Sequence, residues 1–252
     1  DDPATAFNPN AWRGKMRPEQ IHRARAGYYG EISFIDTQIG RLLNWMQRHA
    51  AEALRDTWFV FTSDHGDQLL EHGLMGKNCF FEASVRVPFI IRYPGHVKAG
   101  QYHDLVESVD LLPTLFELAG LPEPNSSQGR SLVGLISPSG GDYAARQAVF
   151  SENVIPEVIT GGRQDFEFIK GQGIRGTRHP DAKMVRTRRW KFIYYPEGFA
   201  ELYDLESDPS ELTNLADRPE YRDQTYEMKD RLLHWLTTAD EADQIAPRWL
   251  RP

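Results

Sequence analysis

A short apolar segment runs directly into residues whose side chains bind metals and anions. In "VFTSDHGDQLLEHG", residues 60–73, Asp64 and His65 come immediately after the apolar residues. A carboxylate next to an imidazole is a usual beginning of a divalent metal site. Ligands of open α/β sheets bind beyond the carboxyl ends of the strands, which is where these two residues fall. We therefore predict a metal site here, with its remaining ligands supplied from elsewhere.

For Asp64 and His65 to reach one ion, the chain must leave the strand between them. Successive side chains of a strand point to opposite faces, so a regular strand would separate the two. Gly66 follows and permits a sharp turn. Further along, Lys77 lies in the connection "LMGKNCFFE" over the same strand end. An ammonium group there could reach an anionic oxygen as a point charge.

Two buried strands and a long helix must position these residues. Apolar residues recur at spacings of three and four within 17–49, which predicts a helix with one apolar face and Pro18 in its first turn. That face comprises Ile32, Ile35, Ile39, Leu42, Leu43 and Met46. The segments 56–64 and 87–95 are almost wholly apolar, which is typical of strands buried on both faces of a parallel sheet.

The rest of the chain shows different patterns, which predict helices and an antiparallel sheet. Residues 104–120 form a helical pattern that stops at Gly120. Segments 147–152, 182–196 and 200–209 alternate between apolar and polar residues, as in an antiparallel sheet. A last helix is expected over 219–239. Its predicted buried residues are Tyr226, Met228, Leu232, Leu233, Trp235 and Leu236.

Composition excludes several classes of protein. The 252 residues carry a net charge of −7 and their arginines are dispersed, so the sequence lacks the basic patch that is typical of nucleic-acid-binding proteins. One cysteine, Cys79, rules out an internal disulfide framework. No apolar run approaches the roughly 18 residues of a membrane-spanning helix. The chain starts at Asp1 without methionine, and we expect a cut or processed start. We expect a soluble protein, cytoplasmic or periplasmic.

Several motifs in sequence order resemble one family. The segment 57–95, the segment "VESVDLLPTLFELAGLP" and the elements "ELYDLESDPSELTNLA" are similar to the C-terminal half of formylglycine-dependent sulfatases. The closest resemblance is to the branch that contains choline sulfatases and phosphonate monoester hydrolases. The resemblance covers nearly the whole chain, from about residue 28 to about residue 236.

The resemblance implies a fold and two domains. The fold class is α/β, part of an alkaline-phosphatase-like sandwich with a mostly parallel sheet, followed by a small α+β subdomain with an antiparallel sheet. Residues 1–140 would be the C-terminal portion of the catalytic domain, and residues 141–252 the subdomain. A loop-rich stretch before the boundary agrees with that division.

The resemblance also implies roles for four residues. Asp64 and His65 match metal ligands, and calcium is the metal expected first, with manganese, magnesium and zinc as alternatives. Lys77 matches the catalytic lysine that contacts the sulfate and the nucleophile. His72 matches a family element that could bind substrate, although a structural role is the stronger expectation.

The family's nucleophile is missing from this sequence. It is a formylglycine made from the first residue of a Cys/Ser-x-Pro/Ala-x-Arg segment, and the 252 residues contain none. Cys79 lacks both the Pro/Ala and the Arg. Asp1 and Asp2 follow no strand, so we do not assign them as the family's paired metal-binding aspartates. We expect the nucleophile in a missing N-terminal half of the same enzyme.

Three functions remain open from the sequence. The first is hydrolysis of sulfate esters of small molecules or glycans, with this chain supplying the second half of the site. The second is hydrolysis of phosphonate or phosphate esters on the same scaffold, because tetrahedral oxyanions present similar oxygens to a metal and a lysine. The third is a non-catalytic fragment or interaction module. A homo-oligomer is possible in each case, and neither nucleic acid nor a membrane is an expected partner.

Overall fold

The computed structural model describes residues 16–74, 76–77, 79–123, 127–153, 182–196 and 198–243. They form two compact units, which we describe separately. Unit 1 comprises the described residues up to Val97, and unit 2 the described residues from Lys98 onward. The predicted boundary between residues 140 and 141 remains a prediction.

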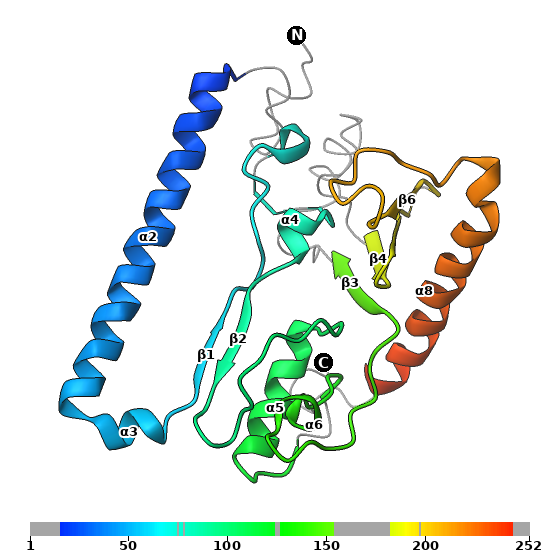
Figure 1. The fold of residues 1–252 in the computed structure, drawn as a ribbon. Coiled ribbons are helices and arrows are strands. Elements are labelled where there is room, and N and C mark those ends of the chain that lie inside the picture. Colours follow the sequence, from blue (N-terminus) through cyan, green and yellow to red (C-terminus); the bar gives the residue numbers. More distant parts are fainter. Residues whose placement is uncertain are drawn as a thin grey trace, which may run out of the picture. The chain divides into compact units, whose positions relative to one another are not determined.

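Unit 1 begins with the long helix α2, Pro18–His49 (Figure 1). Its extent agrees with the prediction, and Pro18 lies in the first turn, where its missing N–H costs no hydrogen bond. A second short helix, α3, Ala51–Arg55, follows. The predicted apolar face is not buried, however, because α2 contains no buried residue. Ile35 is 52% exposed, since no described element packs over this part of the helix.

The two apolar segments of unit 1 form a pair of strands. β1, Phe59–Thr62, runs antiparallel to β2, Phe89–Arg92. We had expected them in a parallel arrangement. The 3-10 turn η1, Glu71–Gly73, and the one-turn helix α4, Glu82–Val85, lie in the connection between them. Apolar runs indicate that a strand is buried but not in which direction it runs, so the sequence did not reveal the antiparallel pairing. The strands are also half-buried rather than buried on both faces.

Unit 2 begins with three short helices. They are η2, Ser108–Asp110, then α5, Leu111–Leu118, and α6, Val133–Ile136. The helical pattern starts later than predicted because the backbone is still extended at Glu107. Gly120 ends it as predicted, with a φ of +65°.

A buried ion cluster holds this helical region to the sheet of unit 2. The carboxylate of Asp110 is fully buried and pairs with Arg146, which also lies 2.9 Å from Glu107. Glu107 in turn accepts a 2.7 Å hydrogen bond from the backbone N–H of Phe150 in the first strand of that sheet. Each buried charge therefore has a partner, as burial requires.

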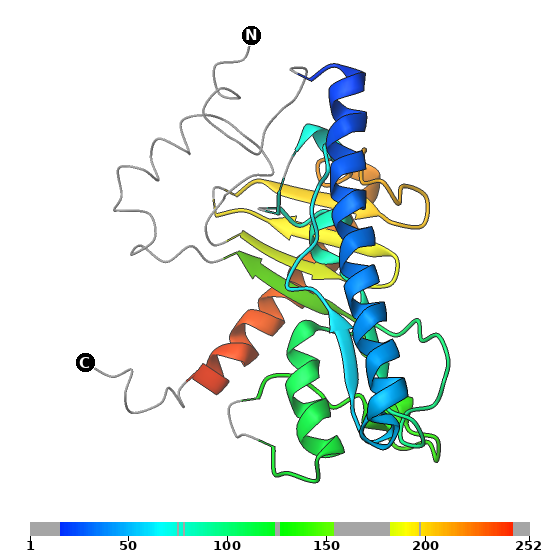
Figure 2. The same ribbon diagram turned by 90° about the vertical axis from the view of Figure 1, so that its left-hand side faces the viewer.

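The sheet of unit 2 has four strands in sequential, antiparallel order, as predicted (Figure 2). They are β3, Val149–Asn153; β4, Ala182–Arg186; β5, Trp190–Tyr194; and β6, Ala200–Asp204. Hydrophobic residues directly opposite one another cross all four strands on one face. These are Phe150, Val185, Phe192 and Leu202.

The last helix covers this apolar row. α8, Arg222–Asp243, follows the 3-10 turn η3, Pro219–Tyr221, and buries Met228 and Leu232 against the sheet. Trp235 stacks on the ring of Phe150 at 4.8 Å between centroids. Two residues of the predicted buried face were wrong: Tyr226 and Leu233 are more than half exposed, because they lie away from the sheet.

The other face of the sheet buries a charged pair. Lys191 Nζ lies 2.6 Å from Glu211 Oε1, and both side chains are at most 2% exposed. The backbone of Glu211 is left-handed, with φ +55°. The preceding Asp208 shapes this turn by accepting hydrogen bonds from Thr213 N and, through its carbonyl, from Glu211 N.

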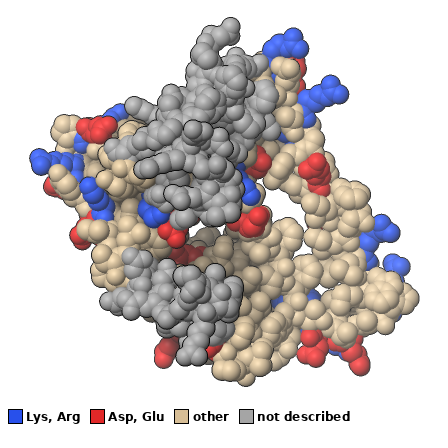
Figure 3. Space-filling model, turned by 180° about the vertical axis from the view of Figure 1, so that it is seen from behind, with Lys and Arg blue, Asp and Glu red and all other residues tan. Residues whose placement is uncertain are grey.

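The surface of the described residues carries charges of both signs. Lysine and arginine are interspersed with aspartate and glutamate on the face shown in Figure 3. In the described part of the chain, no helix is both long enough and apolar enough to cross a membrane.

Candidate functional site

The candidate site is built on the turn that follows β1. The backbone N–H of Gly66 donates a 2.7 Å hydrogen bond to the carbonyl oxygen of Ser84 in α4. A Cβ atom at Gly66 would lie 2.0 Å from the carbonyl oxygen of Ala83. Only glycine therefore fits where the chain crosses this helix, and the predicted turn is present.

The turn brings Asp64, His65 and Lys77 together. Oδ2 of Asp64 lies 3.2 Å from Nε2 of His65, and Nζ of Lys77 forms a short contact with the same ring nitrogen. The Asp64 side chain is 80% exposed and that of His65 is 37% exposed. The grouping agrees with the sequence prediction, whereas the chemical roles of the three residues remain predictions.

The imidazole of His65 is held by its other nitrogen. Nδ1 lies 2.8 Å from the carbonyl oxygen of Gly66, and it must donate because a carbonyl only accepts. In the neutral ring, Nε2 then carries the lone pair that faces Asp64 and Lys77. A backbone carbonyl on the distal nitrogen is the usual way in which proteins orient a metal-binding histidine.

The Asp64 carboxylate is stabilised in its ionised form. Desolvation opposes ionisation and is the largest single influence, but the neighbouring His65, hydrogen bonds from the backbone and the charge of Lys77 together outweigh it and lower the pKa of Asp64. A carboxylate and an imidazole thus lie side by side, next to one ammonium group. Such a donor set fits a divalent cation.

This pair does not make a complete metal centre. Among the described residues, no group of three or more His, Cys, Asp or Glu side chains could hold an ion. The assignment of Asp64 and His65 as two metal ligands therefore remains a prediction.

The loop that carries Lys77 is a compact hairpin. Gln68 N donates to Gly76 O at 2.9 Å, and Leu70 N donates to Leu74 O at 2.8 Å. The Asp67 carboxylate accepts from the backbone N–H groups of Leu69 and Gly76, at 2.9 and 3.4 Å. Asp67 thereby ties the two ends of the hairpin together next to Lys77. We did not predict this role, although an aspartate bonding two residues ahead is a recognisable turn signal.

Buried polar groups attach this hairpin to α4. Nε2 of Gln68 donates to the hydroxyl of Ser84 at 2.9 Å, and both side chains are at most 2% exposed. The thiol of Cys79 lies 3.3 Å from the same hydroxyl. This environment agrees with a structural cysteine rather than a modified one.

The hairpin contains three non-glycine residues in the left-handed region: Leu69, Leu70 and His72, with φ between 45° and 70°. Such conformations are uncommon for residues with a side chain. The ring of His72 stacks on Phe81 at 3.8 Å and nearly parallel. This contact agrees with the structural role, and substrate binding by His72 remains a prediction.

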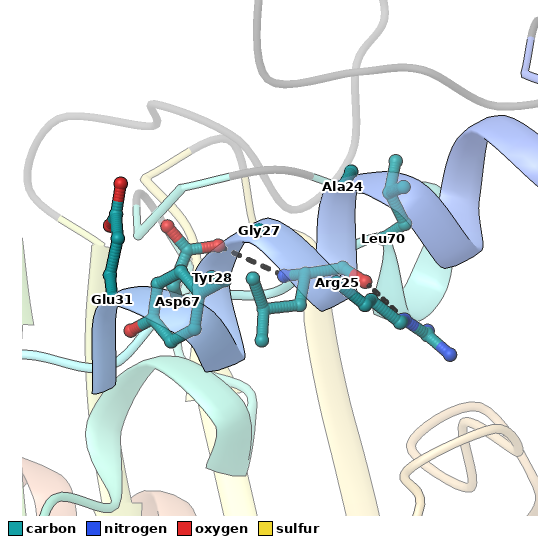
Figure 4. A pocket seen from close by; sticks show the side chains of 8 residues that line it. Ala24, Arg25, Gly27, Tyr28, Glu31, Asp67 and Leu70 are labelled. Carbon is teal, nitrogen blue, oxygen red and sulfur yellow. Dashed lines mark hydrogen bonds between the residues drawn. The ribbon is translucent and has the colours of Figure 1, made fainter. Parts of the chain in front are cut away.

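A pocket of about 250 Å³ lies where the hairpin meets α2. Arg25, Tyr28 and Glu31 of α2 line it together with Asp67 and Leu69 (Figure 4). Arg25 Nε donates a 2.9 Å hydrogen bond to the carbonyl oxygen of Leu69, so its charge is engaged with the wall of the pocket. Acidic and basic groups are mixed here, and the lining favours no single class of ligand.

Two family models match the chain in sequence order. The sulfatase model matches residues 2–121, and the model of the C-terminal part of N-sulphoglucosamine sulphohydrolase matches residues 175–238. The motifs on which the predicted resemblance rests lie largely within these two stretches.

Individual relatives agree with the models. An arylsulfatase of Clostridium perfringens is 30% identical over 92% of this chain and 44% of its own length. A choline-sulfatase of Rhizobium meliloti is 31% identical over 92% and 42%. The crystal structure of the phosphonate monoester hydrolase of Agrobacterium radiobacter matches 90% of this chain and 44% of that protein, with 30% identity and a TM-score of 0.75.

The chain belongs to the sulfatase family, and its fold is that of this alkaline-phosphatase-like group. It spans less than half the length of each of these three relatives.

Proposed function

We propose that this chain supplies one half of the active site of a metal-dependent sulfate-ester hydrolase. The observation that carries the proposal is the convergence of the Asp64 carboxylate and the Lys77 ammonium on one ring nitrogen of His65. The group lies at the end of β1, on a turn that only glycine permits. Family membership then supports sulfate esters as the substrate class.

Asp64 and His65 would hold the divalent metal. The ion would polarise the sulfate oxygens as a Lewis acid. The lowered pKa of Asp64 keeps its carboxylate charged for this purpose, and the Gly66 carbonyl orients the His65 ring by accepting a hydrogen bond from Nδ1. Calcium is our first assignment. Because an imidazole ligand also suits softer ions, manganese, magnesium or zinc would fit as well. Elemental analysis of the purified complete enzyme would identify the metal.

Lys77 would stabilise negative charge on the sulfate oxygens. An ammonium group fixed at this point needs no reorganisation as charge develops during S–O cleavage. The nucleophile, which we expect to be a formylglycine, and the remaining metal ligands would come from a companion N-terminal segment. The chain itself contains no Cys/Ser-x-Pro/Ala-x-Arg sequence.

The test is the Lys77→Ala variant of the complete enzyme. We expect turnover of an aryl sulfate to fall by roughly 10²–10³-fold, the effect of removing one preorganised donor to an oxyanion. The thermal unfolding temperature should hardly change, because Lys77 is exposed. The matched control is Lys98→Ala, which removes another exposed lysine. Full activity of Lys77→Ala would refute the assignment.

A second substrate class has its own support. The phosphonate monoester hydrolase of Agrobacterium radiobacter has the same fold over 90% of this chain. Phosphonate or phosphate esters would present similar tetrahedral oxygens to the metal and Lys77. A panel of aryl sulfate, phenylphosphonate ester and phosphate diester substrates would decide between the classes, because kcat/KM should be highest for the true one.

A further inference from the structure

The carboxylate of Asp67 connects both ends of the hairpin that carries Lys77, and the proposed chemistry gives it no part. One of its oxygens, Oδ1, accepts hydrogen bonds from the backbone N–H groups of Leu69 and Gly76, at 2.9 and 3.4 Å. Leu69 lies near the start of the hairpin, and Gly76 is the residue directly before Lys77. A single oxygen atom therefore fixes the backbone at two places, one of them next to the lysine.

The backbone of Leu69 is held in an unfavourable conformation by two side chains. Its φ of +45° lies in the left-handed region, which bulky residues rarely adopt. Asp67 binds its N–H group, and Nε of Arg25 in α2 donates a 2.9 Å hydrogen bond to its carbonyl oxygen (Figure 4). Strained backbone of this kind persists only where the surrounding structure holds it, and it is concentrated at functional sites. The shape of the hairpin thus depends on these two side chains.

Gly76 is also fixed through both of its backbone groups. Its carbonyl oxygen accepts a 2.9 Å hydrogen bond from Gln68 N, while its N–H group donates to Asp67. The side chain of the next residue, Lys77, is exposed and reaches Nε2 of His65. Packing does not hold an exposed lysine in place, so the position of its ammonium group depends on the backbone from which the side chain starts.

We propose that Asp67 is a positioning residue for Lys77. Its Oδ1 atom holds the hairpin in the shape that places the ammonium group beside His65. The inference rests on the proposed function, in which Lys77 stabilises charge on the substrate. Both hydrogen bonds come from neutral N–H groups to one oxygen, so the role requires an acceptor at this place and no negative charge.

Two other roles would make different demands on Asp67. A metal ligand or a general base needs the ionised carboxylate, whereas a purely structural residue would affect the enzyme whether or not Lys77 is present. Among the described residues, Asp67 does not complete a group of three metal-binding side chains with Asp64 and His65. Asp67→Asn, which keeps the acceptor oxygen without the charge, and a combination with Lys77→Ala distinguish the three roles.

Steady-state kinetics of the complete enzyme with an aryl sulfate provide the first test. Asp67→Ala should lower kcat by about 10–100-fold with little change in KM, because it displaces a group that acts in the transition state. Asp67→Asn should retain the wild-type kcat. The matched control is Glu71→Ala, which removes an exposed carboxylate from the same hairpin and should leave kcat unchanged. Asp67→Ser is a milder second variant, because its short side chain can serve Leu69 but not Gly76.

The double variant of Asp67→Ala with Lys77→Ala separates positioning from general damage. If Asp67 acts through the lysine, its loss should change kcat by less than about twofold once Lys77 is absent. Hydrogen exchange gives a measurement that does not depend on activity. Amide exchange in peptides covering residues 67–77 should be faster in Asp67→Ala than in the wild type and unchanged in Glu71→Ala.

Four results would each overturn the inference. They are full activity of Asp67→Ala, an equal loss of kcat with and without Lys77, a folded Asp67→Asn enzyme as slow as Asp67→Ala, and unchanged amide exchange in Asp67→Ala. The proposed function fails by a different result, which is full activity of Lys77→Ala. A slow Lys77→Ala enzyme together with a normal Asp67→Ala enzyme would therefore refute the role of Asp67 alone.

Discussion

At the scale of single residues, Gly66 determines whether Asp64 and His65 can act on one ion. Its N–H is bonded to Ser84, and the space beside its Cα is filled by the Ala83 carbonyl. The backbone of α4 is a rigid obstacle, so a larger residue must displace the turn itself. The geometry of the two proposed metal ligands thus depends on a residue that has no side chain.

The Gly66→Ala variant should lose both stability and activity. The new methyl group would lie 2.0 Å from a backbone oxygen, and overpacking of this kind costs about 1–3 kcal/mol. Turnover by the complete enzyme should fall further than stability alone explains, because the ligand pair moves. The control is Gly27→Ala, in open space on α2, which should stabilise the helix by about 0.5–1 kcal/mol. An active, normally stable Gly66→Ala enzyme would contradict this account.

A second residue-scale prediction concerns pH. Asp204 accepts two hydrogen bonds from Arg189, at 2.7 and 3.0 Å, and these lower its pKa below the ordinary 3.8. A lowered folded-state pKa stabilises the fold above the unfolded value, and this stabilisation disappears as pH falls through the folded value. Arg189→Ala should therefore be less stable than the wild type at about pH 7. The difference should vanish in acid below the pKa of Asp204.

Urea denaturation at several pH values would measure this difference. Arg188→Ala is the control, because Arg188 is 65% exposed and lies 3.7 Å from its carboxylate partner. A stability difference between Arg189→Ala and wild type that stays constant into acid would exclude the proposed origin.

The order of residues predicted that Asp64, His65 and Lys77 lie together, and their chemical roles remain predictions. These three residues could be grouped from the sequence because Asp64 and His65 follow an apolar strand and Lys77 follows a glycine. Asp67 and the Gln68–Ser84 hydrogen bond could not, since their partners are set by how the hairpin folds onto α4. The sequence shows which groups can bond, and the fold decides which ones do.

At the scale of elements, the bounds of the helices were more predictable from the sequence than the contacts that cover them. Pro18 and regular apolar spacing marked α2 nearly to the residue. Periodicity identifies an apolar face but not what covers it, and this is why the exposure of Ile32 and Ile35 was missed. The antiparallel pairing of β1 and β2 was missed for a related reason, because apolar runs carry no information about strand direction.

The sheet of unit 2 buries the ion pair between Lys191 and Glu211. The alternation of apolar and polar residues along the strand would by itself have predicted that Lys191 faces solvent. Lys191→Met should destabilise the fold by about 3–5 kcal/mol, because it leaves the buried Glu211 carboxylate without a counter-charge. Glu211→Gln should cost a similar amount. The double variant should cost much less than the sum. Denaturant titration of the four proteins would measure this coupling.

The control for this cycle is Lys183→Met. Lys183 pairs with the half-exposed Glu152 at 3.1 Å, so its loss should cost at most about 1 kcal/mol. Strictly additive effects of the Lys191 and Glu211 substitutions would show that the two charges do not depend on each other.

At the scale of the whole molecule, the two units differ in how well they can support themselves. Unit 2 has a four-stranded sheet with α8 packed on a continuous apolar row. Unit 1 has two strands and a helix without a buried residue. The candidate chemistry therefore lies in the unit that has less core of its own.

The 252-residue chain alone should hydrolyse no sulfate ester. In the proposed function, Asp64, His65 and Lys77 act together with a nucleophile that this sequence does not contain, so the chain alone would lack the group that attacks the ester. The measurement is an aryl sulfate assay on the purified chain at high concentration, with calcium, manganese, magnesium or zinc added in turn. Turnover that follows the chain through purification, free of any other polypeptide, would contradict the prediction.

The exposed indole of Trp45 gives the molecule a built-in optical reporter. Its position on α2, 58% exposed, should let a water-soluble quencher such as iodide reach it readily, whereas the ring of Trp235 is stacked on Phe150. If α2 acquires a cover, the part of the emission that comes from Trp45, one of six tryptophans, should shift to shorter wavelength and escape the quencher. Assembly of the enzyme could then be followed in real time by fluorescence, without any label.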